Sequence, residues 1–445
     1  MQCQKSKKLL ILLLNKCIIL RKTYKYKISN NFIEKLYFYS SKFEFHSFLL
    51  SNKFKSDRYS KYQNLIALGI YDSIESNNNS MTKMQIFLDK NSDWTFGFLS
   101  YDLKNELEDL DSKNIDDFDF PNIYFVVPET VLIISDSNLI VKSFLKKEEV
   151  DTMISEVKNL VNYSINKNKI KLNSRESKKD YKEKIRKIKN HIQRGDIYEM
   201  NYCHEFYSRG VEICPEKIFI DLNKTSKAPF SIFSKIGSKY LMCSSPERFL
   251  KKIGDKLITQ PIKGTCKRGE NFDEDQSLLK KFHESKKDRI ENIMITDLVR
   301  NDLSKIAKKS TVNVEELFKV YTFERVHQMV TTVSAFIKNG IGFSDIIEST
   351  FPMGSMTGAP KIKSMQLIDK YETKKRSLFS SAFGYIEPGG DFDFNVVIRS
   401  IIYDNAQKYI SVMVGGAITI ESDAEEEYQE TLIKAQAMID VLKDD

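Results

Sequence analysis

The sequence has few residues of the kinds that bind zinc or form disulfides. Its 445 residues include six cysteines and five histidines, and no two cysteines form a CxxC pair. The histidines are scattered and do not stand at metal-ligand spacing from the cysteines. The sequence therefore argues against a zinc site, and its cysteines are typical of the reduced thiols of a cytoplasmic protein.

Motifs for binding nucleotides and nucleic acids are also missing. The glycine-rich segment 351–361, FPMGSMTGAPK, lacks the GxxxxGK[ST] pattern of a Walker A loop. The formal net charge is +8, but lysine is spread along the chain without a basic stripe of interleaved aromatic residues. We therefore expect no nucleic-acid partner.

One apolar run near the N-terminus is similar to a targeting segment. Residues 1–20 have a basic start followed by LLILLLNKCIIL. This run is too short to span a bilayer, is interrupted by Asn15 and Lys16, and is not followed by a small-residue cleavage site. We interpret residues 1–23 as an extension outside the fold and expect no stable membrane association. The alternative is an export or membrane signal.

The rest of the composition is typical of a globular protein. The chain is 41% hydrophobic and 29% charged, and it is long enough for two domains or one large one. A polar stretch over 146–173 separates a predicted N-terminal subdomain, residues 24–165, from a second domain, residues 175–445. In the second domain, periodicity predicts helices over 178–194 and 423–442, and a long helix or two in tandem over 276–309. It predicts strands over 196–208, 391–403 and 409–420.

Residues 239–264 are predicted to form a β-hairpin around Gly254-Asp255, because a glycine-first pair is typical of a two-residue turn. In that register Glu247 lies opposite residue 262, one position from Lys263. A bulge at Pro246 or Pro261 would absorb this offset. The facing carboxylate and amine are consistent with an acid and a nucleophile. They are equally consistent with an exposed cross-strand ion pair, worth roughly a few tenths of a kcal/mol.

Three glutamates are candidates for binding a divalent cation. Glu291 lies among apolar residues of the helix pattern over 276–309, where a carboxylate needs a cationic partner or a metal. Glu427 and Glu430 share one face of the predicted helix over 423–442, and carboxylate oxygens suit a hard cation. The alternative for this pair is a solvated acidic first turn that the helix dipole favours.

Two glycine-containing segments are predicted to approach a ligand. Gly415 and Gly416 stand together inside the strand pattern over 409–420, and such glycines often mark close approach to the backbone. Segment 351–361 leads into a helix near Ala359-Pro360, and the free N–H groups of a helix start suit an anion. The alternative for this segment is a plain loop leading into a helix.

The second domain contains seven motifs: SSPERFL, PIKGT, KDRIENIMITDLVRNDL, VHQMVTTV, GSMTGAPK, FNVVIRS and VGGAI. In this order and spacing they resemble the motifs of the chorismate-utilising enzymes. The resemblance is strong over residues 175–440 and weaker over 24–165. The resemblance implies an α+β fold in which two mainly antiparallel β-sheets pack together, with outer helices and an active site between the sheets. It also implies that segment 45–52, FHSFLLSN, is the counterpart of the family's amino-acid pocket.

Within this family the residue after Pro-Ile separates the branches. Lys263 in PIKGT is typical of the branch that makes 4-amino-4-deoxychorismate, a precursor of p-aminobenzoate and folate, whereas alanine is usual in the branches that make anthranilate, isochorismate or salicylate. The resemblance implies that Lys263 attacks C2 of chorismate while Glu247 protonates the departing 4-hydroxyl. Ammonia then attacks C4 and releases the lysine. The alternatives are an anthranilate synthase component I and a non-catalytic regulatory homologue.

The resemblance also assigns ligands and a partner. It implies that Mg²⁺ is held by Glu291 and Glu430, with Glu427 beside them. Because the chain has no amidotransferase signature, ammonia is expected from a separate glutamine amidotransferase subunit. Two departures affect the pocket: Gln328 stands where histidine is common, and Phe379 where tyrosine is common. The implied substrate contacts are Arg399, Gly415, Gly416, Thr265, Ser355 and Lys361.

Overall fold

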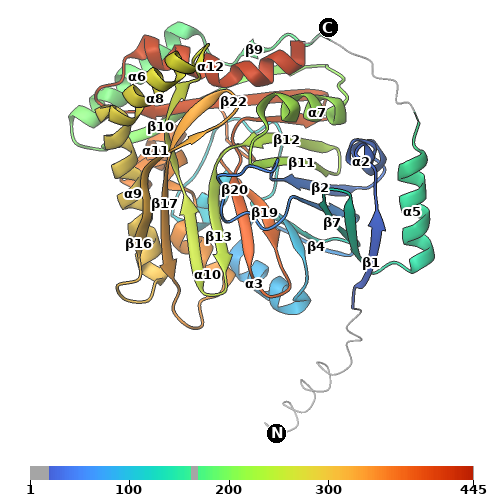
Figure 1. Cartoon of the computed structure of the whole chain (residues 1–445). Coiled ribbons are helices and arrows are strands. Elements are labelled where there is room, and N and C mark those ends of the chain that lie inside the picture. The colour runs from blue at the N-terminus through green and yellow to red at the C-terminus, as the bar shows by residue number, and fades with distance from the viewer. Residues whose placement is uncertain (1–19, 162–168, 444–445) are drawn as a thin grey trace, which may run out of the picture.

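The computed structural model describes residues 20–161 and 169–443 (Figure 1). Over these residues the chain forms two antiparallel β-sheets, of 12 and 10 strands, with helices on their outer sides. The expected α+β fold is therefore confirmed. Most of the predicted extension, residues 1–19, lies outside the described residues, and strand β1 begins at Lys22. Within the described ranges, no helix is both long enough and apolar enough to cross a membrane.

The 12-stranded sheet has the order β1-β8-β7-β3-β2-β11-β12-β21-β22-β10-β18, with β9 paired to β10. Its strands come from both of the predicted ranges, 24–165 and 175–445. They are β1 (Lys22–Lys27), β2 (Phe45–Leu50), β3 (Asn64–Leu68), β7 (Thr130–Ser135), β8 (Asn138–Ser143), β9 (Asn173–Ser174), β10 (Glu199–Arg209), β11 (Phe230–Ile236), β12 (Lys239–Ser245), β18 (Gly358–Ala359), β21 (Ser400–Asp404) and β22 (Tyr409–Ile418).

The 10-stranded sheet has the order β15-β17-β14-β13-β20-β19-β5-β6-β4, with β16 paired to β17. It too combines strands from both ranges, so the two ranges share both sheets. Its strands are β4 (Asp72–Ser76), β5 (Thr95–Leu99), β6 (Ile123–Val127), β13 (Arg248–Ile253), β14 (Lys256–Gln260), β15 (Ile262–Lys267), β16 (Asn313–Thr322), β17 (Val326–Phe336), β19 (Ala382–Ile386) and β20 (Phe392–Val396).

The two sheets pack face to face because their strands carry apolar side chains on both sides. On β5, Phe96 and Phe98 point the same way and join side chains of the other sheet, such as Leu65 and Leu241. Leu99 points to the opposite side and packs against the outer helices. Burying each phenylalanine contributes roughly 1.5–3 kcal/mol, so the layers are held mainly by this inner core.

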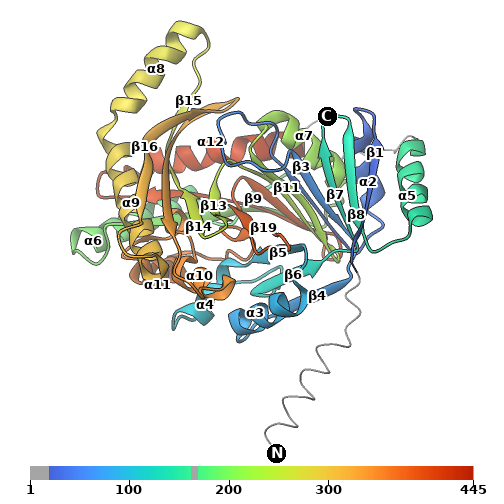
Figure 2. The same ribbon diagram turned by 60° about the horizontal axis from the view of Figure 1, so that its bottom comes forward.

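Helices cover the outer face of each sheet. The 12-stranded sheet is covered by α2 (Phe32–Ser40), α5 (Lys147–Asn159), α7 (Pro215–Ser226) and α12 (Ala424–Lys443). The 10-stranded sheet is covered by α3 (Ser80–Asn91), α9 (Lys286–Ile306) and α10 (Phe343–Thr350). Helices α6 (Lys178–Gln193) and α11 (Lys361–Tyr371) pack beside β10. Figure 2 shows α8 (Phe272–Glu284) extending outward from the end of α9.

The predicted helices are confirmed, and α6 illustrates the reason. Tyr181, Ile185 and Ile188 recur at helical spacing and are fully buried. Ser177 caps the start by accepting a hydrogen bond from the backbone N–H of Asp180. Gly195 follows the end of the helix with a φ of +80°, which suits a helix stop. The longer pattern over 276–309 divides into α8 and α9 at Ser285, which caps α9.

Two predicted strands are interrupted where the chain passes from one sheet to the other. The pattern over 391–403 divides into β20 and β21, which belong to different sheets, and Arg399 lies between them with a φ of +52°. The first arm of the predicted hairpin divides in the same way into β12 and β13. Because β12 pairs with β21 and β13 with β20, both crossings occur side by side.

The hairpin register agrees with the prediction near the turn. Ile253 pairs with Lys256, and Gly254 has the positive φ, +59°, that a glycine-first turn requires. The predicted bulge at Pro246 or Pro261 is wrong. The pairing instead shifts between Arg248 and Lys251 on β13, and between Ile262 and Thr265 on β15.

Candidate active site

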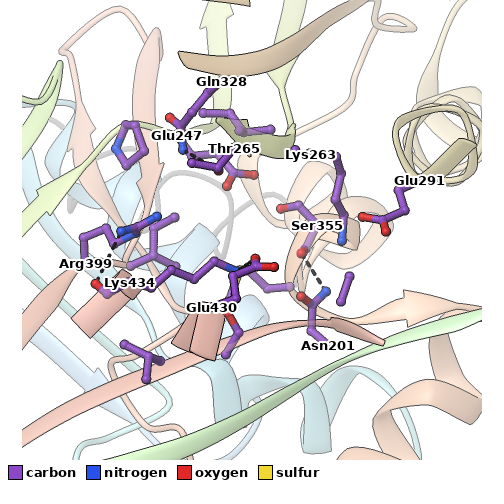
Figure 3. Close-up of a pocket in the computed structure, with 18 of the residues that line it drawn as sticks. Asn201, Glu247, Lys263, Thr265, Glu291, Gln328, Ser355, Arg399, Glu430 and Lys434 are labelled. Atoms are coloured by element: carbon purple, nitrogen blue, oxygen red, sulfur yellow. Dashed lines mark hydrogen bonds and ion pairs between the residues drawn. The ribbon is translucent and has the colours of Figure 1, made fainter. Parts of the chain in front are cut away.

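A cavity of about 160 Å³ lies beside the two sheet crossings (Figure 3). Elements far apart in the sequence contribute to it: the β12–β13 and β20–β21 crossings, β15, α9, β22 and α12. The structure brings together there most of the predicted site residues: Glu247, Lys263, Thr265, Glu291, Ser355, Arg399, Gly415, Glu427 and Glu430. Gln328 and Phe379, the two departures from the family pattern, line it as well, and the structure adds Asn201, Lys287 and Lys434.

Glu247 lies at the crossing between β12 and β13. Its side chain is 3% exposed and lines the cavity. Burial raises the pKa of Glu247 to about 7, although the Ser355 hydroxyl and the Lys263 ammonium lower it. A carboxyl group with a pKa near 7 is suited to donate a proton at neutral pH.

Lys263 reaches the same cavity from β15, which pairs with β17 and not with β13. Glu247 and Lys263 are therefore neighbours across a cavity rather than partners across two paired strands. Lys263 is 6% exposed, so the alternative of an exposed ion pair does not hold. The ammonium of Lys263 lies 3.4 Å from Oε1 of Glu199, a residue of β10 that the sequence patterns did not single out.

Glu291 approaches the cavity from α9, and its carboxylate points toward the Lys263 side chain in Figure 3. Burial raises the pKa of Glu291 to about 7, against the effect of the Lys263 ammonium; Glu199 adds to the rise. The predicted apolar setting of Glu291 thus corresponds to a buried carboxylate beside a lysine. An ion of opposite charge at this place would favour its ionised form.

The α12 carboxylates are both paired in the structure. Lys434 Nζ lies 2.6 Å from Oε1 of Glu430, and this ammonium lowers the pKa of Glu430 against the effect of burial. Lys287 Nζ lies 3.5 Å from Oε1 of Glu427, which also accepts a hydrogen bond from the Ser422 hydroxyl at 2.7 Å. Burial raises the pKa of Glu427. The alternative of a solvated acidic turn therefore does not fit Glu427, whose side chain is buried.

These glutamates fit a hard divalent cation by donor type, because carboxylate oxygens of Glu291, Glu427 and Glu430 line one cavity. Within the described residues, however, no three acidic, histidine or cysteine side chains form a ready-made ligand cluster. A cation binding here has to compete with Lys434 for Glu430 and with Lys287 for Glu427. Mg²⁺ accordingly stays a prediction.

Arg399 and Gly415 line another side of the cavity, with Gly416 next to them in the chain. The guanidinium of Arg399 donates a hydrogen bond to the Lys434 carbonyl at 3.3 Å. Burial lowers the pKa of Arg399, while the Glu430 carboxylate raises it. Gly415 accepts a hydrogen bond from Lys434 Nζ through its carbonyl at 2.9 Å. Gly416 is not among the described lining residues, but a Cβ there would lie 3.3 Å from Oε2 of Glu427, so any side chain would crowd the carboxylates.

The remaining pocket residues differ in burial: Gln328, Asn201 and Ser355 are buried, whereas Thr265 is exposed. Gln328 Nε2 donates to the Thr265 hydroxyl at 3.4 Å, while Oε1 of Gln328 has no hydrogen-bond partner among the described residues. Asn201 donates to the Ser355 carbonyl at 2.7 Å and holds segment 351–361 against β10. Phe379 lines the cavity with an apolar ring where a tyrosine would have added a hydroxyl.

Lys361 is the predicted site residue that the structure places elsewhere. Its ammonium pairs with Asp302 of α9 and contacts the Thr350 carbonyl at 3.3 Å. Lys361 does not line the cavity, because the first turn of α11 faces α9 rather than the sheet crossings.

Comparison with known proteins identifies the family. The profile of the chorismate binding enzyme family matches residues 37–440. The chain belongs to this family. Within it, the cavity is the natural candidate for the chorismate site, since the predicted motif residues converge there.

Two curated relatives represent different branches of the chorismate binding enzymes. The chain is 36% identical over 269 residues to aminodeoxychorismate synthase component 1 of Escherichia coli (strain K12), covering 60% of this chain and 58% of that protein. It is 28% identical over 366 residues to anthranilate synthase component 1 of Aquifex aeolicus (strain VF5), covering 78% and 74%. The chain thus aligns with little more than half of the E. coli relative.

A solved structure supports the fold. The crystal structure of anthranilate synthase component I from Streptococcus pneumoniae TIGR4 superposes with a TM-score of 0.75, covering 84% of this chain and 92% of that one. The sequence identity is 22%, so this likeness bears on the fold alone.

Sequence reasoning missed several polar residues at or next to the site, among them Lys287, Lys434, Glu199 and Asn201. Lys287 and Lys434 each stand four residues from a predicted glutamate, Glu291 and Glu430, and this spacing places a lysine on the same helix face. For Glu199 and Asn201 the available signal was alternation, because they share one side of β10. Alternation along a strand does not reveal which other element packs against Glu199 and Asn201, and the cavity is formed by that packing.

Proposed function

We propose that this chorismate binding enzyme converts chorismate and ammonia to 4-amino-4-deoxychorismate. The observation that carries the proposal is Lys263, a buried amine that lines the cavity beside Glu247. The relatives named aminodeoxychorismate synthase component 1 support this reading, and the anthranilate synthase relatives keep the rival open. Lysine at position 263 favours amination at C4 over anthranilate synthesis.

The proposed chemistry divides the reaction between an acid and a nucleophile. Lys263, as a neutral amine, attacks C2 of the ring, and both ring double bonds shift by one position so that the bond between C4 and its oxygen breaks. Glu247 protonates the 4-hydroxyl, which leaves as water. A carboxyl group with a raised pKa suits this task, since it keeps its proton near neutral pH. Ammonia then attacks C4, both double bonds shift back, and Lys263 is released.

The charges around the cavity support binding of a substrate with two carboxylates. Arg399 offers a guanidinium that makes a single hydrogen bond to protein among the described residues, so it retains donors for a carboxylate. Glu291 and Glu430, with Glu427 beside them, would hold Mg²⁺, which when bound would withdraw charge through the ring carboxylate. Thr265 and Ser355 offer hydroxyl groups at the cavity wall.

A separate glutamine amidotransferase subunit is the proposed source of ammonia. The sequence carries no amidotransferase signature of its own. Ammonium salt should replace such a partner in vitro.

One assay tests the proposal. The purified protein is incubated with chorismate, MgCl₂ and ammonium salt, and aminodeoxychorismate lyase is then added. We expect p-aminobenzoate, and we expect EDTA to abolish its formation until Mg²⁺ is restored. Anthranilate fluorescence without lyase would move the assignment to anthranilate synthase. Absence of turnover, even with an added amidotransferase subunit, would favour a regulatory homologue.

A further inference from the structure

Glu199 is a buried carboxylate that neither the sequence motifs nor the proposed chemistry employs. Its side chain is fully buried on β10, behind the wall of the cavity that Lys263 lines. The Lys263 ammonium lies 3.4 Å from Oε1 of Glu199. Among the described residues, neither carboxylate oxygen of Glu199 has a hydrogen-bond partner. The carboxylate is therefore held by a single ion pair.

Such a pair is a poor stabilising device. Removing two charges from water costs several kcal/mol per ion, and the mutual attraction offsets this only when additional hydrogen bonds satisfy the remaining lone pairs. Glu199 lacks those hydrogen bonds. A buried charge that is incompletely satisfied and lies beside a reactive cavity is more typical of a functional site than of a structural one.

Lys263 needs a proton acceptor before it can act as a nucleophile. The ammonium form has no free electron pair, and a neighbouring carboxylate favours that charged form. Three carboxylates face Lys263 from different elements: Glu199 of β10, Glu247 at the β12–β13 crossing and Glu291 of α9. Glu247 is needed as a proton donor, and Glu291 is a candidate metal ligand. Glu199 is the one of these three that forms an ion pair with the lysine.

We propose that Glu199 is the positioning residue that fixes the Lys263 ammonium and accepts its proton when the amine attacks the substrate. The inference rests on the proposed function and deepens it. The ion pair holds Nζ in place until substrate fills the cavity and excludes water. The pair then becomes a neutral amine and a carboxylic acid, which a water-free environment favours over two charges.

The protons balance over the cycle. The ammonium transfers one proton to Glu199, and the neutral amine forms a bond to C2 while water leaves C4 with the proton of Glu247. Ammonia attacks C4 and passes a proton to the Glu247 carboxylate. The bond from Nζ to C2 breaks and the amine leaves with the electron pair, so Glu199 can return its proton. No oxidant or further reactant is required.

Glu199→Gln tests this role, because the amide keeps the shape of the side chain and removes the acceptor. The protein is mixed with chorismate and Mg²⁺ without ammonia, and mass spectrometry follows the adduct on Lys263, whose mass is that of chorismate less water. We expect the adduct to form about 10²-fold more slowly in the variant at pH 7.5. The deficit should shrink as the pH rises, because hydroxide then replaces the missing carboxylate as the proton acceptor.

The ratio of variant to wild-type rates at each pH separates this role from others. Titration of Glu247 affects both proteins alike and cancels in the ratio. A ratio that stays constant across pH indicates a merely structural role and overturns the inference, as does an adduct that forms at the wild-type rate. If the wild-type protein itself forms no adduct, the covalent role of Lys263 fails, and this inference fails with it.

Glu205→Gln is the matched control, since Glu205 is an equally buried glutamate of the same strand and does not line the cavity. Its pH profile for adduct formation should follow that of the wild-type protein. Should the control variant Glu205→Gln not fold, Glu199→Asp provides a second test. It retains a carboxylate on a shorter side chain and should recover part of the rate with the wild-type pH dependence; a profile like that of Glu199→Gln would overturn the inference.

Discussion

Two buried glutamates of β10, Glu199 and Glu205, differ in how fully their charges are satisfied. Glu205 accepts hydrogen bonds from Arg175 at 2.8 Å, Tyr409 at 2.7 Å and Ser411 at 2.5 Å, and Lys374 lies 3.1 Å away. Glu199 faces Lys263 at 3.4 Å and has no hydrogen-bond partner among the described residues. Both side chains are fully buried.

The difference shows how one strand can serve stability and chemistry at once. A carboxylate with four partners is locked, because moving its proton or its position would break all of these interactions together. A carboxylate with one partner can exchange a proton with that partner at small cost to its surroundings. The half of β10 that carries Glu199 also carries Asn201, which lines the cavity. Glu205 lies six positions farther along the strand and does not line it.

The largest expected effect concerns Glu247, a third buried glutamate, which lines the cavity itself. Glu247→Gln should lower turnover of chorismate by about 10²–10⁴-fold, because the amide cannot protonate the leaving hydroxyl. Steady-state formation of p-aminobenzoate in the coupled assay measures the loss, and circular dichroism checks the fold. A loss below tenfold would place Glu247 with the structural glutamates.

Stability should distinguish Glu205 from Glu199 most directly. Glu205→Gln is expected to lower the free energy of unfolding by about 3–5 kcal/mol, since it removes a fully buried anion that four groups satisfy and leaves Lys374 and Arg175 to share Asp117 alone among the described residues. Glu199→Gln should change it by about 1 kcal/mol or less, because Lys263 still faces two other carboxylates. Urea unfolding of the two variants measures both values. Equal losses in the two variants would contradict the distinction.

The pH dependence of stability offers a third test. Burial raises the pKa of Glu247 from 4.5 to about 7, so the folded state retains a proton that the unfolded state loses. The stability that this proton contributes is therefore full below pH 4.5 and disappears as the pH rises to 7. The change amounts to about 3 kcal/mol. The difference in unfolding free energy between wild type and Glu247→Gln should shift by this amount between pH 4.5 and 7, and a constant difference would refute the prediction.

The smallest expected effect concerns Lys361, a partly buried lysine whose partner lies outside the cavity. Lys361→Met should leave the KM for chorismate within about twofold of the wild-type value, because its ammonium pairs with Asp302. Removing a charge that contacts a substrate carboxylate costs about 1.5–3 kcal/mol, which would raise KM more than tenfold. Arg399→Met, which removes a cation that lines the cavity, is the matched control and should show the larger rise.

Local patterns predicted a helix or strand well where regularly spaced apolar residues were bounded by a capping or turn residue. Helix α6 followed from its apolar spacing, its Ser177 cap and Gly195. The turn at Gly254 and the pairing beside it followed from turn chemistry. The convergence of Lys263, Glu247, Glu291 and Arg399 on one cavity followed from the family motifs, which the fold now brings together.

Other features had no local signal. The pattern over 391–403 reads as a single strand, since alternation does not show that the chain leaves one sheet at Val396 and enters the other at Ser400. Lys361 lies in a motif whose neighbours line the cavity, yet its side chain turns to Asp302. Glu199 is one charged residue in a strand that is buried along most of its length, and its role depends on β15 lying beside it.

The sequence by itself therefore determined the residue types of the site, the helices and strands that carry them, and the family to which the chain belongs. These depend on short-range periodicity, capping and motif order, which are local properties. The tertiary structure alone decided which lysine faces which carboxylate. The pairing of Glu199 with Lys263 and the crossings beside the cavity arise where strands more than 50 residues apart in the sequence come together, and burial there removes the solvent that would otherwise screen their charges.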